Sequence, residues 1–225
     1  MQKVTLAAAL MAGTMLATPA LAVTIKGNIG ATSDYVWRGD TQSKGDASIS
    51  GGIDVDLGNG FAVGVWTASL GGNRLELDEE GDPISDDSAD YETDLYGSYS
   101  FDVGSIGMEV GYIAYQYPGE AESVEDFEEY YVTADFGVLS VSYFRLDDAE
   151  NATTKAEDGK YLSIDTGFEL EDGWSLGLHY GSEDKKGASG DTDTAISLSK
   201  GEVTFTVSGD EDDDTRAVVS WGRSF

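Results

Sequence analysis

The residue best suited to acid–base chemistry is His179, the only histidine of the chain. An enzyme interpretation would pair it with Asp165, on a neighbouring strand-like segment, as a general acid–base couple. The sequence contains no G-x-S-x-G segment and no second histidine that could complete a metal pair. These observations favour a hydrogen-bonded structural histidine, so we expect no catalytic residues and no cofactor.

Carboxylates that alternate with apolar residues suggest a different chemistry, the attraction of cations. In a water-filled passage, such carboxylates enrich cations and repel anions. Alternatively, they pair with basic residues and hydrogen-bond donors and fill a closed interior. The candidate lining residues are Asp54, Asp94, Glu109, Asp135, Asp165, His179 and Lys26.

The segment of residues 33–43 mixes aromatic, basic and acidic side chains at the start of a long connection. Loops often carry binding groups, so this segment is a candidate functional element. In one interpretation it folds inward as a constriction, with Arg38 facing acidic residues. In the other, Tyr35 and Trp37 belong to an external aromatic girdle and Arg38 pairs with Asp34 or Asp40.

Two kinds of site are not supported by the sequence. Asp210, Asp212 and Asp214 have the alternate spacing of a calcium loop, but the central glycine and the glutamate at the twelfth position are missing. We therefore expect no defined metal site. The chain also has no cysteine, which excludes haem attachment through C-x-x-C-H, cysteine-bound iron–sulfur clusters and thiol chemistry.

The N-terminal segment Met1–Ala22 is typical of a secretory signal peptide. Lys3 provides the positive start, an apolar stretch follows, and Ala20-Leu21-Ala22 fits the cleavage site. The mature chain would then be a single domain, residues 23–225.

The negative net charge of the chain limits the kinds of partner that it can bind. It has 13 basic and 43 acidic residues, a net charge of −30, and loss of Lys3 changes this to −31 (12 − 43). Nucleic-acid binding is excluded because phosphate backbones require basic patches. We expect small cationic or neutral solutes as partners instead.

Short segments with period two dominate the chain after residue 22, and they are bounded by Gly, Asp, Asn and Ser. The predicted strands are residues 23–32, 47–57, 61–70, 92–103, 108–117, 129–136, 139–146, 160–170, 174–181, 193–199, 203–208 and 216–225.

The connections between these strands alternate strictly in length. Five are tight turns that contain glycine, and the six that alternate with them are longer and carry clusters of acidic residues. This rhythm and the even strand count are typical of outer-membrane barrels, with short periplasmic turns and long extracellular loops. We therefore predict an all-β, up-and-down, antiparallel transmembrane β-barrel of about 12 strands, in contact with outer-membrane lipid and lipopolysaccharide.

The C-terminal strand ends on Phe225, and its apolar face includes Trp221. A terminal phenylalanine closing such a strand is similar to the C-terminal signature of bacterial outer-membrane barrels. We expect Trp221 and Phe225 to form the signal that the barrel-assembly machinery recognises.

The segment of residues 27–66 resembles the TorF-type family of proteobacterial outer-membrane porins. The matching residues are Ser33-Asp34-Tyr35, Arg38-Gly39, Thr41-Gln42-Ser43, Gly51-Gly52, Gly60-Phe61, Gly64 and Trp66. Where members of that family often continue G-F-Y, this chain has Gly60-Phe61-Ala62. The resemblance implies an outer-membrane barrel and a channel, and it carries no catalytic residue over to this chain.

The sequence thus predicts a porin-like channel for passive diffusion of ions or small solutes, with a preference for cations. Two alternatives remain open. One is a closed structural or adhesive barrel that presents acidic loops to partners. The other is a barrel hydrolase that depends on His179.

Overall fold

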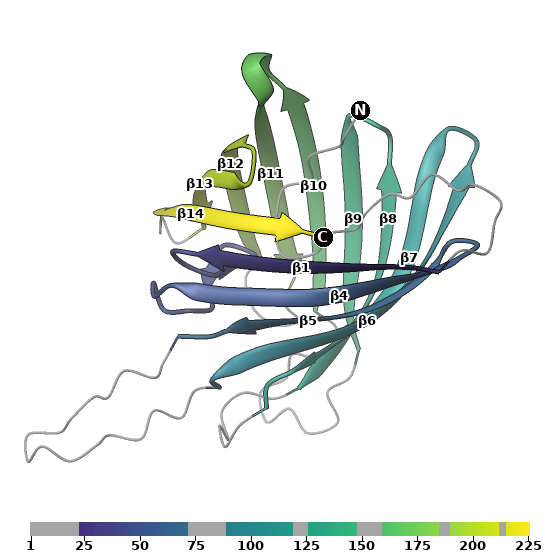
Figure 1. The fold of residues 1–225 in the computed structure, drawn as a ribbon, viewed down its shortest axis with the longest axis horizontal. Coiled ribbons are helices and arrows are strands. Elements are labelled where there is room, and N and C mark those ends of the chain that lie inside the picture. Colours follow the sequence, from purple (N-terminus) through teal and green to yellow (C-terminus); the bar gives the residue numbers. More distant parts are fainter. Residues whose placement is uncertain (1–22, 72–88, 119–125, 148–158, 185–189, 212–214) are drawn as a thin grey trace, which may run out of the picture.

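The structure is a computed structural model, and it describes residues 23–71, 89–118, 126–147, 159–184, 190–211 and 215–225. Twelve strands within these residues close into one antiparallel barrel, and each strand pairs with its neighbours in sequence. The last strand, β14, pairs with the first, β1, and Figure 1 shows the yellow β14 beside the purple β1. None of the helices in the described part of the chain is long and apolar enough to cross a membrane.

The barrel strands follow the predicted segments closely. Their bounds are β1 Thr24–Thr32, β4 Ser48–Gly58, β5 Phe61–Ser69, β6 Tyr91–Val103, β7 Ile106–Gln116, β8 Phe127–Asp135, β9 Leu139–Asp147, β10 Lys160–Glu169, β11 Trp174–Asp184, β12 Asp191–Lys200, β13 Val203–Asp210 and β14 Thr215–Ser224. The predicted all-β barrel is therefore confirmed. The shortest predicted strands are longer in the structure, because they continue into residues assigned to the loops.

The tight turns place glycine at positions with positive φ, a backbone conformation that is unfavourable for residues with a Cβ atom. Between β4 and β5, Asn59 and Gly60 both have positive φ, 54° and 87°. Positive φ at both central residues is the type I′ pattern, whose twist matches that of the flanking strands. Gly104 and Gly201, with φ of 64° and 62°, begin the turns after β6 and β12. These turns lie at one end of the barrel, which we call the short-turn end.

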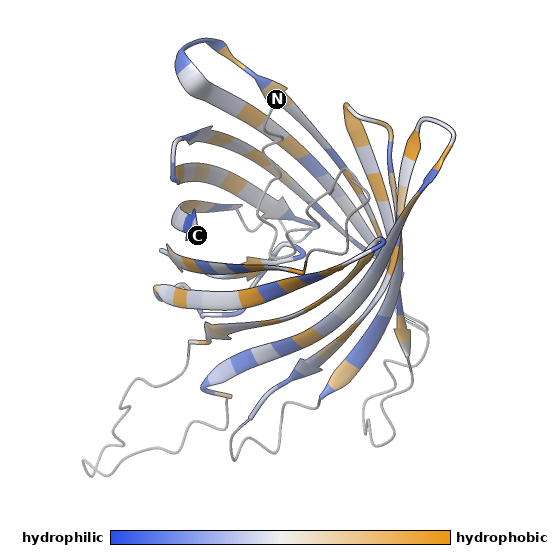
Figure 2. Cartoon of the chain, turned by 45° about the vertical axis from the view of Figure 1, so that its right-hand side comes forward, coloured by the Kyte–Doolittle hydropathy of each residue, from blue (hydrophilic) through white to orange (hydrophobic). Residues whose placement is uncertain are grey.

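The outer face of the barrel is apolar, as the alternation predicted. Figure 2 shows hydrophobic and hydrophilic residues alternating along the strands. Exposed side chains include Ile49, Ile53, Leu95, Phe168, Ile196 and Phe205. Aromatic residues with exposed side chains also lie at strand ends, such as Phe136 after β8 and Trp174 at the start of β11. An apolar exterior of this extent suits hydrocarbon rather than water.

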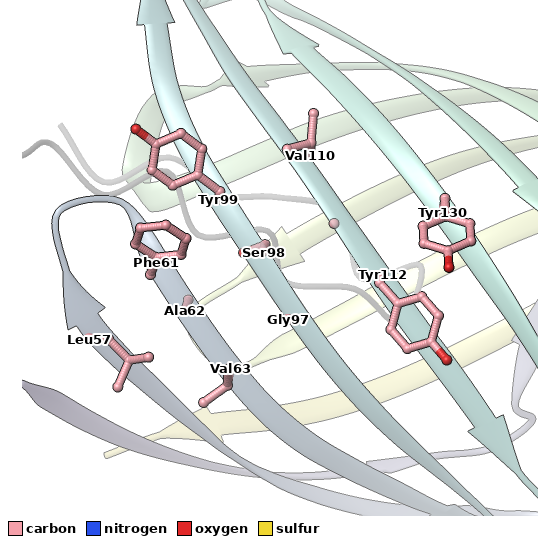
Figure 3. Close-up of a pocket in the computed structure, with 11 residues that line it drawn as sticks. Leu57, Phe61, Ala62, Val63, Gly97, Ser98, Tyr99, Val110, Tyr112 and Tyr130 are labelled. Atoms are coloured by element: carbon pink, nitrogen blue, oxygen red, sulfur yellow. The ribbon is translucent and has the colours of Figure 1, made fainter.

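A shallow apolar hollow on this outer face surrounds Gly97 of β6. Figure 3 shows Phe61, Val63, Tyr99 and Tyr112 around it. A Cβ atom added at Gly97 would have no heavy atom closer than 3.8 Å. The hollow therefore has room for a methyl group at Gly97.

The seam between β1 and β14 is completed by the last residue. Phe225 exchanges two backbone hydrogen bonds with Gly27, at 2.9 and 3.0 Å. Its ring covers Gly27 so closely that a Cβ there would lie 2.7 Å from the ring. Trp221 Nε1 donates to Glu202 Oε2 at 3.1 Å, which ties β14 to the turn before β13. Both residues thus hold the closure of the barrel, and their role as an assembly signal stays a prediction.

Candidate functional site in the barrel lumen

A small hairpin lies within the connection between β1 and β4. It consists of β2, Val36–Trp37, and β3, Asp40–Thr41, joined by Arg38 and Gly39. Both joining residues have positive φ, 49° and 88°, which again is the type I′ pattern. We call residues 34–43 the lumen hairpin, because its side chains contact inward-facing residues of the barrel wall.

The base of the lumen hairpin is held by a network of short polar contacts. Thr41 Oγ1 donates to Asp34 Oδ1, and Ser43 Oγ lies 2.9 Å from the same oxygen. Ser43 also accepts the Tyr35 backbone N–H at 2.8 Å and is fully buried. A Cβ at Gly71 would lie 1.8 Å from the Ser43 carbonyl oxygen, so only glycine fits against this base.

Arg38 reaches from the hairpin to the barrel wall. Its two terminal nitrogens donate to the two carboxylate oxygens of Glu129 on β8, each at 2.8 Å. The guanidinium carbon lies 4.1 Å from the centre of the Trp37 ring and 4.2 Å from that of Tyr161. This bidentate pair, stacked between aromatic rings, is the strongest geometry available to a guanidinium and a carboxylate.

The pKa values of Arg38 and Tyr35 are shifted in the directions that preserve these contacts. Burial on its own would lower the pKa of Arg38, but the Glu129 carboxylate outweighs burial and raises it. Burial, with Glu92 and Asp94 nearby, raises the pKa of the Tyr35 hydroxyl well above its usual value. Arg38 therefore stays charged and Tyr35 stays a hydrogen-bond donor at any physiological pH.

Other contacts fix the hairpin to different parts of the wall. Tyr35 donates to Glu92 Oε1 of β6 at 2.9 Å and packs edge-on against Trp66 of β5. Trp37 packs against Tyr115 of β7. A Cβ at Gly39 would lie 2.9 Å from Asp193 Cβ of β12 and 3.1 Å from Asp210 Cβ of β13. The hairpin starts at the end of β1, and Trp37 and Arg38 reach β7 and β8 on the far side of the barrel, so it crosses the lumen.

An acidic cavity of about 250 Å³ lies at the tip of the hairpin, at the long-loop end of the barrel. We call it the mouth cavity. Its lining residues are Arg38, Asp40, Glu183, Asp191, Thr192, Asp193, Asp210 and Glu211. No group of His, Cys, Asp and Glu among the described residues has an arrangement that could hold a metal ion.

Tyrosines from the wall cover several of the predicted lining acids. Tyr96 OH donates to Asp54, and its ring lies over Gly64 on the strand between them. Tyr131 OH donates to Glu109 Oε1 at 2.8 Å. Tyr131 likewise lies against a glycine, Gly111, so both tyrosines occupy space that a side chain at the glycine would otherwise fill. The acids are thus hydrogen-bond acceptors as well as charges.

Replacing Gly64 with alanine is therefore expected to destabilise the barrel by about 1–3 kcal/mol, the usual cost of overpacking. The new Cβ would lie 2.3–2.5 Å from atoms of the Tyr96 ring, so the ring and its bond to Asp54 must move. Urea unfolding of the protein in detergent micelles would measure this. Gly97→Ala is the matched control, because its Cβ would make only ordinary van der Waals contacts, at 3.8 Å, and it should change stability little.

His179 is held between two carboxylates. Its Nδ1 lies 2.7 Å from Asp165 Oδ1, and its Nε2 lies 2.8 Å from Asp193 Oδ1. Tyr161 OH is 3.1 Å from the same Nε2. The pairing of His179 with Asp165 appears in the structure, but both ring nitrogens are occupied. This arrangement suits a structural bridge between β10, β11 and β12 better than a general base.

The remaining predicted lining residues lie in different surroundings. Asp94 points inward but is only 3% exposed, and its Oδ1 has no hydrogen-bond partner among the described residues. Asp135 accepts the Gly137 N–H at 2.6 Å and so belongs to a turn at the short-turn end. Lys26 is exposed and lies opposite Asp54 in the β1–β4 register. The predicted residues therefore form no single ring.

The structure also brings in residues that the sequence analysis did not select. Glu129, Glu92 and Asp193 all contact the hairpin or its neighbours. Two of them lie on the same inward face as a selected residue of their own strand, Glu129 with Asp135 on β8 and Glu92 with Asp94 on β6. The alternation of inward and outward side chains along β6 and β8 could have selected Glu92 and Glu129. Only the structure shows that both contact the hairpin. The acidic loop residues 72–88, 119–125 and 212–214 lie outside the described residues.

Solved structures share this fold at low sequence identity. The KdgM porin in complex with disordered oligogalacturonate matches with a TM-score of 0.54 at 10% identity, covering 90% of this chain and 98% of that one. A membrane protein from work on in-meso crystallization matches with a TM-score of 0.52 at 8% identity, covering 89% and 83%. At such identities the likeness shows the barrel fold alone.

No curated protein matches this chain in sequence. A family model for a bacterial protein of unknown function, Gcw_chp, matches residues 16–216. The match spans nearly the whole barrel and includes the lumen hairpin, whereas the TorF-type resemblance stays a prediction. The chain therefore belongs to the Gcw_chp family.

Proposed function

We propose that this protein is an outer-membrane channel for passive diffusion, and that the lumen hairpin is its constriction. The observation that carries the proposal is the combination of a closed barrel with an apolar exterior and a charged hairpin folded across its lumen. An apolar exterior would place the barrel in a bilayer, with the start of β1 and the end of β14 on the periplasmic side, where the short turns lie. The porin fold of the solved neighbours and the TorF-type resemblance support this proposal.

The proposed solutes are cations and small neutral molecules. The mouth cavity has six carboxylates and one guanidinium among its lining residues, so it would concentrate cations at the long-loop end. Lipopolysaccharide and the barrel-assembly machinery would be partners of the exterior and of the C-terminal strand. The occupied ring nitrogens of His179 favour this channel over a hydrolase.

Single-channel recording of purified protein in a planar bilayer, under a salt gradient, tests the channel. We expect discrete steps and a reversal potential that favours cations. Silence from folded, inserted protein would instead favour the closed barrel, in which the hairpin and the buried cluster of Ile113, Tyr115 and Tyr131 seal the interior.

Neutralising the mouth cavity should reduce the cation preference. The double variant Asp40→Asn with Asp191→Asn removes two charges beside Arg38, and we expect its reversal potential to shift toward zero. Glu171→Gln with Asp172→Asn removes the same charge from an exposed turn at the opposite end. An equal shift in both variants would show that general surface charge, and not the mouth cavity, sets the preference.

A further inference from the structure

We infer that the wall around Glu129 forms a binding site for guanidinium-type organic cations, and that Arg38 fills this site in the resting protein. The inference deepens the proposed function, because it names a class of cation that the constriction would recognise. We call the site the Glu129 cage. Its wall residues are Tyr115, Glu129, Phe144 and Tyr161.

The geometry of the Glu129 cage matches a planar forked cation. Both Glu129 oxygens accept from the guanidinium, each at 2.8 Å. The Tyr161 and Phe144 ring centres lie 4.2 and 5.2 Å from the guanidinium carbon, within the range of cation–π attraction. Tyr115 OH donates to Glu129 Oε2 at 3.1 Å and holds the carboxylate in position. An ammonium or a potassium ion could not make the parallel pair of hydrogen bonds.

Because the Glu129 carboxylate is buried, the Glu129 cage is stable only when a cation occupies it. Glu129 is only 2% exposed, and a buried carboxylate without a partner is strongly unfavourable. These wall residues come from β7, β8, β9 and β10, whereas Arg38 comes from the hairpin. The cage is therefore complete without Arg38, and any departure of the hairpin tip leaves a site for another cation.

The mouth cavity supplies a route to the cage. Arg38 belongs to both, since it lines the cavity and binds Glu129. Cations gathered by the acidic lining would thus meet the cage next. They would compete with a tethered side chain, whose effective concentration is on the order of millimolar for a short flexible link. In the resting protein, Arg38 accordingly keeps weakly binding cations out.

Replacing Arg38 with glycine empties the Glu129 cage, so that guanidinium binding to it can be measured directly. Arg38→Gly suits the backbone, because φ is 49° at this position and glycine adopts positive φ freely. Isothermal titration calorimetry with guanidinium chloride, on protein folded in detergent, should show binding to this variant. Ammonium chloride is the control probe. Wild-type protein and the double variant Arg38→Gly with Glu129→Gln should bind guanidinium about tenfold more weakly or not at all.

The same variants separate this inference from the proposed channel. In a bilayer, guanidinium should reduce the potassium current of Arg38→Gly and leave the double variant unaffected. Calorimetric binding with silent bilayers would keep the cage and overturn the channel. Currents without selective binding to Arg38→Gly would overturn the cage and keep the channel. If Arg38→Gly does not fold, Arg38→Asn replaces it, since asparagine also tolerates positive φ, and the same outcomes decide.

Discussion

Replacing residues 34–43 with a Gly-Ser segment of equal length is expected to raise the single-channel conductance several-fold. The hairpin contacts the wall from β5 to β8 through Trp66, Glu92, Tyr115 and Glu129, and it reaches β12 at Gly39. Its removal would leave a twelve-stranded barrel without the obstruction that the hairpin forms. Barrels of this size lie between those filled by side chains and those with wide channels.

The measurement is single-channel conductance in a planar bilayer, with uptake of neutral sugars of increasing size into liposomes as a second readout. A Gly-Ser replacement of Glu171–Gly173 is the control, since that turn lies outside the lumen. Unchanged conductance in the hairpin variant would mean that the narrowest point lies elsewhere, and would remove the constriction from the proposed function.

The barrel could be predicted from the sequence because its strands and tight turns depend on residues that are close together in the chain. Period-two alternation requires one face of each strand to be apolar, and tight turns require residues that adopt positive φ. Asn59-Gly60 and the glycines at 104 and 201 marked those turns in the sequence, and the structure has them there. Strand ends differed by up to three residues, as at Asp184, because pairing with a neighbour extends a strand beyond its local pattern.

The position of the lumen hairpin could not be predicted from the sequence. Tyr35 and Trp37 suit an outer girdle as well as a packed interior, and alternation assigns no face to a loop. Arg38 has two aspartates close in sequence, yet it binds Glu129, 91 residues away. That choice depends on barrel closure, which brings β8 and the hairpin together, so no local signal could reveal it.

The chemistry of the lining acids was only partly predictable. Parity placed Asp54, Glu109 and Asp165 inside, but it could not say that tyrosine and histidine side chains would engage them. Tyr96 reaches Asp54 only because Gly64, between them, has no side chain. A carboxylate that accepts such hydrogen bonds still repels anions, but it is less available to a passing cation than a free one. The mouth cavity is accordingly the better place to seek ion preference.

Glu129→Gln alone is expected to lower the free energy of unfolding by about 3–5 kcal/mol. The change leaves the Arg38 guanidinium buried among aromatic rings without its carboxylate, and removing one partner of a buried ion pair has a cost of that size. Adding Arg38→Gly should recover much of the loss, because the orphaned charge is then gone. Arg38→Gly alone leaves the Glu129 carboxylate without its two guanidinium hydrogen bonds and should also destabilise the barrel.

Urea unfolding of all four proteins in the same detergent, followed by tryptophan fluorescence, gives the coupling energy as a double-mutant cycle. A coupling of several kcal/mol would mean that the hairpin is held in the lumen mainly by this one charged contact. Since Asp34, Thr41 and Ser43 hold the base separately, loss of the Arg38 contact should free the tip while the base stays folded. Additive single effects would instead mean that Arg38 and Glu129 are independent, and that packing around Tyr35 and Trp37 holds the hairpin in place.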